Sequence, residues 1–340
     1  MNLKSLSSEE LADYLTALGL PKYRSNQIFA WIYRRKVCSW EAMTDLPLEL
    51  RRFLEDKGVS LGCLPVVSQV RDAGGAVKYL FGLDDGETVE AVYLPEANRK
   101  TVCFSTQVGC GMGCLFCATG QRGMVRNLTP AEIVEQPLRI SVLTGARINS
   151  LVAMGQGEPL ANYDSLLKAV EIINDPRGMG IGARHITVST CGIIPGIERL
   201  AREKYQVNLA ISLHGADDQL RDYLMPINRK YPLEPLLEAC RDYISRTNRR
   251  ITFEYTMIDG INDRPSDLAN LIKLLSGMLC HVNLIPFNPV PNSEFRRSGK
   301  ERIQKFAAGL NRAHIKTTVR KERGGTLAAA CGQLQGKGSL

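Results

Sequence analysis

The sequence predicts an α/β protein whose main part is a partial or complete barrel built from repeated strand–helix units. Three observations support this prediction. Apolar strand candidates alternate with helical stretches several times from residue 100 onward, which is typical of a parallel sheet covered by helices. The first 60 residues show helical spacing of apolar positions, and residues 62–96 show the short alternation of strands. We therefore expect a small helical N-terminal domain and a short β element before the barrel.

Length and composition exclude several classes of protein. The chain has 340 residues, of which 44% are hydrophobic and 23% charged, so it can bury a core. A typical domain of ~150 residues predicts about two domains. No apolar run reaches the ~18–20 residues that span a bilayer, and the acidic start of the chain does not resemble a signal peptide. We expect a cytoplasmic protein without membrane segments.

Net charge and cysteine content indicate the kind of chemistry and partner. Lys and Arg number 43 and Asp and Glu 35, which gives a net charge of +8. This charge favours a polyanion such as nucleic acid without requiring one. Ten cysteines in a reducing compartment favour metal ligation or redox chemistry over structural disulfides.

Residues 1–60 are expected to form the helical N-terminal domain. Apolar residues recur at helical intervals in Ser8–Leu15 and again after Pro21. The stretch from position 22 to position 36 contains basic residues and no acidic residue: Lys22, Arg24, Arg34, Arg35 and Lys36. Such a basic helical face suits a phosphate backbone, although a solvated helix face has the same composition.

Residues 61–99 are expected to form a small β linker element. Val77–Phe81 and Thr88–Tyr93 have the composition of strands, and the turn-forming segment Asp84–Gly86 separates them. These two strands would lead directly into the main domain.

Residues 100–322 are expected to form the barrel, and residues 323–340 a C-terminal tail. The strand candidates are Thr101–Thr106, Ser150–Met154, His185–Ser189, Val207–Ser212, Ile251–Met257, His281–Pro286 and Lys316–Arg320. Helical stretches lie between them, for instance Pro130–Leu143, where Thr129 is the cap and Glu132 completes a capping box.

Three cysteines on one loop carry the clearest chemical signal. Cys110, Cys114 and Cys117 have the spacing C-x3-C-x2-C and follow the first barrel strand. Three thiolates on such a loop can hold three irons of a [4Fe–4S] cluster and leave the fourth iron open for a chelating cofactor. A structural zinc site usually needs four protein ligands, commonly in two separated pairs, and no second pair accompanies this loop. The spacing therefore favours a cluster over zinc.

This loop resembles that of the radical S-adenosylmethionine (SAM) superfamily, including the aromatic Phe116 before the last cysteine. Further motifs resemble the dual-specificity RNA adenine-C2 methyltransferases of that superfamily, from about residue 5 to residue 335. These motifs are Cys103–Gly109, Asn127–Thr129, Gly155–Leu160, Leu224–Asn228, Val282–Pro289 and Ala329–Leu334. The resemblance implies a radical SAM partial (β/α)6-type barrel with a [4Fe–4S] cluster on Cys110, Cys114 and Cys117.

The resemblance also implies a reaction, the methylation of carbon 2 of adenine in 23S rRNA and in tRNA. This carbon is electron-poor, so a polar transfer of the electrophilic SAM methyl group should fail, whereas a radical can add to it. In the family, one SAM methylates a cysteine that corresponds to Cys331, and a second SAM supplies the radical that activates this methyl group. A second cysteine, corresponding to Cys103, resolves the protein–RNA adduct and leaves a Cys103–Cys331 disulfide. A carboxylate, corresponding to Glu90, removes the ring proton.

The same resemblance implies SAM contacts at the ends of the barrel strands. Gly157 and Glu158 correspond to a turn where the backbone can approach the ligand and the carboxylate can accept from its ammonium group. The other implied contacts are Ser189, Ser212, Leu213, His214 and Asn288. We further expect an rRNA site at the peptidyl transferase centre, a tRNA site 3′ of the anticodon, an external electron donor, a disulfide reductant and a monomeric protein.

Several positions depart from the family pattern or match no motif. Gln156 stands where the family often has methionine, and Thr326 where it usually has aspartate. Neither change removes a cluster ligand or a catalytic cysteine. The cysteines outside the motifs are interpreted as structural: Cys38, Cys63, Cys191, Cys240 and Cys280.

Two other functions remain open. An adenine-C8 23S rRNA methyltransferase that confers antibiotic resistance has the same cysteines and mechanism, but Ile285–Pro289 is more similar to the C2 enzymes. The other alternative is a non-catalytic RNA-binding protein with a structural iron–sulfur cluster or zinc. The presence of both Cys103 and Cys331 argues against it, because binding alone needs neither.

Overall fold

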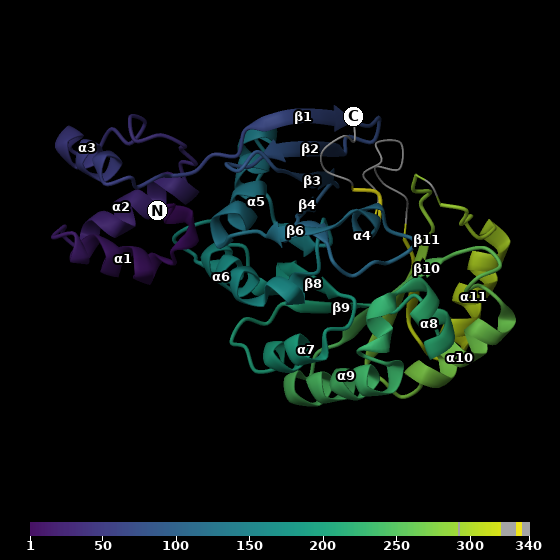
Figure 1. The fold of residues 1–340 in the computed structure, drawn as a ribbon. Helices are drawn as coiled ribbons and strands as arrows, with labels where there is room; N and C mark the ends of the chain where they lie inside the picture. Colours follow the sequence, from purple (N-terminus) through teal and green to yellow (C-terminus); the bar gives the residue numbers. More distant parts are fainter. Residues whose placement is uncertain (292, 321–330, 335–340) are drawn as a thin grey trace.

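One ten-stranded sheet organises the computed structural model, which describes residues 1–291, 293–320 and 331–334 (Figure 1). The order of its strands is β1-β2-β3-β4-β7-β8-β9-β10-β11-β12. Neighbouring strands are antiparallel from β1 to β4 and parallel from β4 to β12. The strands are β1 (Val66–Arg71), β2 (Val77–Gly82), β3 (Thr88–Pro95), β4 (Lys100–Cys103), β7 (Ser150–Ala153), β8 (Ile186–Thr190), β9 (Asn208–Ser212), β10 (Ile251–Met257), β11 (Cys280–Pro286) and β12 (Thr317–Val319).

Helices follow most of the parallel strands and lie around the outside of the curved sheet (Figure 1). They are α1 (Ser8–Ala17), α2 (Tyr23–Tyr33), α3 (Leu48–Asp56), α4 (Ala118–Arg122), α5 (Pro130–Thr144), α6 (Tyr163–Asn174), α7 (Ile194–Leu200), α8 (Asp218–Leu224), α9 (Leu233–Thr247), α10 (Pro265–Leu275) and α11 (Lys300–Arg312). A separate antiparallel pair, β5 (Gln107–Cys110) and β6 (Gly123–Asn127), lies between β4 and α5 in the chain. The α/β fold class is confirmed, and the strand candidates of the sequence coincide with β4 and β7–β12 to within a few residues.

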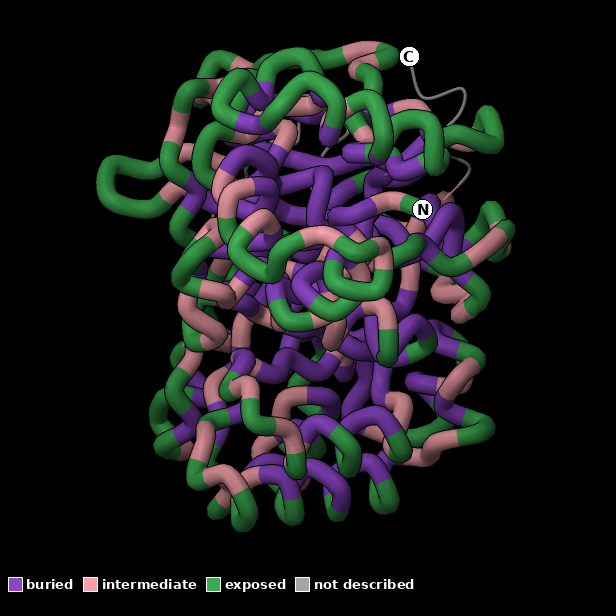
Figure 2. Tube along the Cα trace, turned by 90° about the vertical axis from the view of Figure 1, so that its left-hand side faces the viewer, coloured by how far each residue is buried: buried purple, intermediate pink, exposed green. Residues whose placement is uncertain are grey.

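The parallel strands are apolar because both of their faces are covered. Leu151, Val188, Ile211, Phe253 and Val282 come from five successive strands, and each is fully buried. Seen from the side of the N-terminal helices, buried segments run through the interior and exposed segments form the outer turns (Figure 2). This packing brings the carboxyl ends of β4 and β7–β12 to one edge of the sheet, where a barrel places its ligands.

The N-terminal helices α1–α3 lie to one side of the sheet, next to α5 and α6 (Figure 1). A capping box between Ser7 and Glu10 begins α1. The Lys4 ammonium group contacts the Glu135 carboxylate of α5, and both side chains are buried. The helical region predicted for residues 1–60 is therefore present and is joined to the barrel by a buried ion pair.

The β element of residues 61–99 continues the barrel sheet. Val92 of β3 pairs with Cys103 of β4, so β1–β3 extend the parallel strands on their antiparallel side. The pairing of β3 with β4 provides hydrogen-bond partners for the N–H and C=O groups that β4 would expose if it were an edge strand. Within the described residues, no helix has both the length and the apolar character needed to cross a membrane.

Candidate functional site

Three thiols converge on one pocket at the carboxyl ends of the parallel strands. Cys110 ends β5, and Cys117 is the residue before α4; Cys114 lies between them on a loop that Gly113 turns with a φ of 66°. All three cysteines line the same pocket. The predicted set of thiols is therefore presented together at the edge where ligands bind in barrels.

The protonation of these thiols depends on burial. Burial raises the pKa of Cys110 to about 12 and also raises the pKa values of Cys114 and Cys117. For Cys114, repulsion from the other two thiolates raises the pKa further, and Arg221 opposes the rise. The three thiols therefore interact electrostatically and stay protonated unless a bound cation replaces their protons.

The separation of the thiols fits a multi-iron cluster better than a single zinc ion. Ligand sulfurs ~2.3 Å from one zinc ion lie at most about 4.6 Å from each other. In the described part of the chain, the one set of three candidate ligands that lie within 4.8 Å of one another does not include these thiols. Their arrangement agrees with separate irons of one cluster.

The turn after β7 is shaped for close approach of a ligand. Gly157 has a φ of 96°, and a Cβ atom there would lie 2.5 Å from the Gln107 side chain, so only glycine fits. The buried Glu158 carboxylate accepts from the backbone N–H groups of Cys191, at 2.8 Å, and Leu160, at 3.0 Å. Burial raises the pKa of Glu158, while these donors lower it. Glu158 is thus held rigidly at the pocket wall.

Side chains from β8 and β9 form the neighbouring part of the wall. The hydroxyl groups of Ser189 and Ser212 lie 3.5 Å apart, and both residues line the pocket with His214. The backbone N–H of Thr256 donates to His214 Nδ1 at 3.0 Å, so the neutral ring carries its proton on Nε2. Burial, with Arg221 nearby, lowers the pKa of His214 to about 3. The ring therefore stays neutral at physiological pH.

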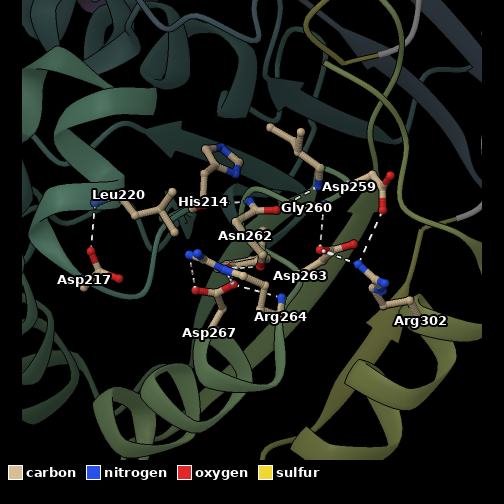
Figure 3. A network of polar contacts seen from close by, with 12 residues as sticks. His214, Asp217, Leu220, Asp259, Gly260, Asn262, Asp263, Arg264, Asp267 and Arg302 are labelled. Carbon is tan, nitrogen blue, oxygen red and sulfur yellow. Dashed lines mark hydrogen bonds and ion pairs between the residues drawn. The ribbon is translucent and has the colours of Figure 1, made fainter. Parts of the chain in front are cut away.

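A polar network behind the wall holds His214 in an unusual backbone conformation (Figure 3). His214 has a φ of 56°, and its carbonyl accepts from Asn262 Nδ2 at 2.8 Å. The same Asn262 amide donates to Thr256 O at 2.6 Å and accepts from Ile258 N at 2.8 Å. Sequence reasoning missed Asn262, although a fully buried asparagine after strand β10 fits a positioning role.

Residues 331–334 are docked beside the thiol loop. Asn288 Nδ2 donates to the carbonyl of Cys331 at 3.3 Å, and the backbone N–H of Ala118 donates to the carbonyl of Gly332 at 2.7 Å. Cys331 lines the pocket together with the three loop cysteines. Thr326 lies outside the described residues.

Cys103 lies next to this docked segment at the end of β4. It is buried and clusters with Leu334 and Met154. Burial raises the pKa of Cys103 to about 12; repulsion from Cys331 adds to the rise, and Arg320 opposes it. Both cysteines are free thiols in this structure. The fold thus brings Cys103 and Cys331 together, although they lie 228 positions apart in the sequence.

Two charged residues of the pocket were not predicted. Arg320 follows β12, and the negative charges of Cys331, first, and of Glu254 and Cys103 raise its pKa. Glu254, from β10, is buried and accepts from Asn283 Nδ2 at 2.8 Å. An acidic residue in an otherwise apolar strand and an arginine at a strand end were the available signals.

Three predicted residues do not line the pocket: Cys103, which lies beside it, Leu213 and Glu90. The Leu213 side chain is fully buried in the main core, because neighbouring residues of a strand face opposite sides and Ser212 faces the pocket. Glu90 is fully buried on β3, and its carboxylate lies 3.0 Å from Lys78 Nζ. The Glu90 backbone N–H donates to Gln156 Oε1 at 3.1 Å. The Gln156 side chain therefore provides an acceptor for this N–H group, and the thioether sulfur of a methionine would be a weaker acceptor.

Comparison with known proteins agrees with this geometry. Residues 104–275 match the family model of the radical SAM superfamily, and residues 1–59 match that of the ribosomal RNA large subunit methyltransferase N-terminal domain. A dual-specificity RNA methyltransferase RlmN from Syntrophobacter fumaroxidans is 47% identical, over 98% of this chain and 97% of its own. A probable RlmN from Pelotomaculum thermopropionicum is also 47% identical, over 99% of this chain and 92% of its own.

A solved structure shows the same fold. The crystal structure of a radical SAM methyltransferase from Sphaerobacter thermophilus has a TM-score of 0.95 and 47% identity, covering 98% of this chain and 99% of that one. Sequence, family models and fold therefore agree over nearly the whole chain. The chain belongs to the RlmN family of dual-specificity RNA methyltransferases, within the radical SAM superfamily.

Proposed function

We propose that this protein methylates carbon 2 of adenine in RNA, with 23S rRNA at the peptidyl transferase centre and tRNA at the position 3′ of the anticodon as its substrates. The observation that carries the proposal is the placement of Cys331 in one pocket with the three loop cysteines, next to Cys103. A protein that only binds RNA needs neither of these two thiols. The RlmN names of the relatives support the choice of carbon 2.

The pocket residues fit the two cofactors that the family implies. Cys110, Cys114 and Cys117 would hold a [4Fe–4S] cluster. SAM would contact Glu158, which can accept from an ammonium group, and the wall residues Ser189, Ser212, His214 and Asn288. When bound, these groups supply a transferable methyl group and a carbon radical, at two SAM per turnover.

In the proposal, Cys331 carries the methyl group on its sulfur. This group would lose one hydrogen atom to the carbon radical, and the methyl carbon then bonds to carbon 2 of adenine. The ring gives up one electron, which the cluster would accept, and its proton goes to a carboxylate. The Cys103 thiolate then forms a bond to the Cys331 sulfur. The bond between that sulfur and the carbon breaks, its electron pair goes to the carbon, and a proton completes the methyl group. The two thiols leave the cycle oxidised as a disulfide, so an external thiol reductant must return two electrons and two protons. An external electron donor must likewise supply the cluster.

Arg320 suits the resolving step. Its positive charge lowers the pKa of Cys103, while burial holds that pKa at about 12. Without a cationic neighbour the buried thiol would form its thiolate less readily. We therefore propose Arg320 as a positioning residue for the reactive form of Cys103.

Glu90 remains the proposed acceptor of the ring proton, and Glu254 is a second candidate because its carboxylate lines the pocket. Glu90→Gln and Glu254→Gln distinguish the two. The acceptor's variant should accumulate the protein–RNA adduct, and the other variant should release methylated RNA. If both variants released it at the wild-type rate, neither carboxylate would be the acceptor.

The N-terminal helices offer a surface for phosphates. Arg34 and Arg35 are exposed just after α2, and the Arg35 guanidinium lies 3.8 Å from the centre of the Trp31 ring. Six residues of α2, Trp31 among them, are buried. We propose that this basic face grips the RNA while the target base enters the pocket, since its carbon 2 is out of reach inside a base stack.

The test is an anaerobic reaction of the cluster-loaded protein with reductant, SAM and either 23S rRNA fragment or tRNA, followed by mass spectrometry of the nucleosides. We expect 2-methyladenosine. Appearance of 8-methyladenosine would assign the protein to the antibiotic-resistance enzymes instead. Cleavage of SAM without a methylated base would refute these substrates, and absence of cleavage with a verified cluster would favour an RNA-binding role.

A further inference from the structure

A second group of candidate metal ligands lies outside the pocket, where three parts of the chain meet. Cys38 follows α2, Cys63 precedes β1, and Glu135 belongs to α5. The two sulfur atoms and a carboxylate oxygen all lie within 4.8 Å of one another. The cluster therefore connects the N-terminal helices, the segment leading into the sheet, and a helix of the barrel.

Backbone contacts hold the segment before Cys63 in place. The N–H of Leu3 donates to the carbonyl of Ser60 at 3.0 Å, and the Lys4 ammonium donates to the carbonyl of Gly62 at 2.8 Å. Gly62 has a φ of 58°, and a Cβ atom there would lie 2.4 Å from Asn2 Nδ2. Glycine adopts this left-handed conformation without strain, and the turn sets the position of Cys63.

The burial of the three groups suits a partly enclosed ion. Glu135 is 3% exposed, Cys38 is half-buried, and Cys63 is exposed. Burial, and a hydrogen bond with Cys63, raise the pKa of Cys38 to about 12, so a metal ion would have to displace its proton. The exposed side leaves room for a water molecule as a further ligand.

The charges in the cluster also match a divalent cation. Two thiolates and the Glu135 carboxylate carry three negative charges, and the buried Lys4 contacting Glu135 carries one positive charge. The remaining two negative charges equal the charge of one divalent ion. Buried charges without such compensation are costly.

We propose that Cys38, Cys63 and Glu135 bind a zinc ion that fastens the N-terminal helices to the barrel. Two sulfurs with one carboxylate oxygen suit zinc, which is tetrahedral and prefers thiolate over the oxygen-only shells of Mg²⁺ and Ca²⁺. Ligands ~2.0–2.3 Å from one ion lie within about 4.6 Å of each other, close to the limit observed here. On binding, two S–H bonds break, two S–Zn bonds form, and two protons leave; no electrons are transferred.

The test measures zinc and iron together in the cluster-loaded protein after exposure to zinc and removal of loosely bound metal with a mild chelator. We expect about one zinc per chain in addition to the full complement of iron. Cys38→Ser and Cys63→Ser should lose the zinc and keep the iron. Cys280→Ser removes a buried thiol at the start of β11 and serves as the matched control, which should keep both.

A second readout separates loss of zinc from loss of folding. Zinc should raise the melting temperature of the wild-type protein and of Cys280→Ser, and leave that of Cys38→Ser unchanged. Three results would overturn the proposal: no zinc in the wild-type protein, equal zinc in Cys38→Ser, or a zinc content that rises as iron falls, which would place the zinc on the cluster loop. The proposal would also be overturned if Cys38 and Cys63 formed a disulfide and the protein bound no zinc at this site after that disulfide had been reduced.

Discussion

The two groups of sulfur ligands differ in how the chain assembles them. Cys110, Cys114 and Cys117 lie within eight residues on one loop, whereas Cys38, Cys63 and Glu135 come from three separate elements. The three thiols of the loop do not all lie within 4.8 Å of one another, whereas the three ligands at the junction do. Spacing along the chain reveals a ligand set when a single loop supplies it, and only folding reveals one that three elements share.

The largest expected effect lies in the pocket. Cys331→Ala should abolish methylated adenosine while SAM cleavage continues, because the methyl carrier is lost and the cluster ligands remain. Quantitative mass spectrometry of nucleosides and of 5′-deoxyadenosine measures both. Cys280→Ala is the control and should retain methylation. Retained methylation in Cys331→Ala would remove the carrier role.

Cys103→Ala should stop turnover after one event and accumulate protein covalently joined to RNA, because the resolving thiol is absent. A denaturing gel with labelled RNA detects the adduct. The double variant Cys103→Ala/Cys331→Ala is the control and should form none. A Cys103→Ala protein that makes methylated RNA at the wild-type rate, without adduct, would refute the resolving role.

At the junction, Lys4→Met should lower the free energy of unfolding by about 3–5 kcal/mol, because it leaves the buried Glu135 without its contacting ammonium group. Chemical denaturation of the zinc-free protein measures this loss. The double variant Lys4→Met/Glu135→Leu should recover most of it, because no buried charge remains. A similar loss in both variants would show that packing, and not charge, determines the effect.

His214 should make the free energy of unfolding depend on pH in acidic solution. Its pKa is about 3 when folded and 6.5 in its ordinary state, so it does not affect stability above pH 6.5. Below that, the unfolded chain binds a proton that the folded chain does not, and stability should fall by about 2–3 kcal/mol from pH 6.5 to pH 4.5. His214→Asn should lose this dependence, because asparagine does not titrate and tolerates the positive φ.

Urea unfolding at pH 6.5 and pH 4.5 measures this difference. The exposed His185 provides the control, since His185→Asn should keep the wild-type dependence on pH. The same fall in stability in His214→Asn as in the wild-type protein would assign the acid sensitivity to other groups.

The smallest expected effect lies on the basic face after α2. Replacing Arg34, Arg35 and Lys36 by alanine should weaken RNA binding about tenfold and make the slope of log affinity against log salt shallower by about 2–3, because three phosphate contacts are lost. Binding titrations at several salt concentrations measure both. A control variant removes exposed basic residues of the outer barrel helices: Arg241, Arg246 and Lys273. Equal slopes for both variants would make the face after α2 an ordinary solvated surface.

Much of the fold could be predicted from the sequence because its signals are local. Period-two and apolar runs identified the strands of the barrel, and the capping residues Thr129 and Glu132 identified the start of α5. The sequence did not show that β1–β3 extend the barrel sheet. That result depends on the pairing of β3 with β4, which is a contact between whole strands.

Some residues of the candidate site could likewise be predicted from the sequence, and others could not. Residues at or just after the carboxyl ends of strands, such as Ser189, Ser212 and Asn288, line the pocket, because all parallel strands end at one edge. Leu213 does not, because the alternation of side chains turns it into the core, and Glu90 is buried beside Lys78. Arg320 and Glu254 were missed, because their role depends on neighbours from distant strands.

The sequence by itself determined the strands, the thiol loop and the family, because each of these is encoded in residues close together or in motifs that keep their order. Only the tertiary structure decided that Asn288 holds the carbonyl of Cys331, that Asn262 holds His214, and that Cys38 meets Cys63 and Glu135. The physical reason is that burial, hydrogen bonding and charge act over a few ångströms in space. Residues that are far apart in the chain acquire these interactions only when the sheet brings their elements together.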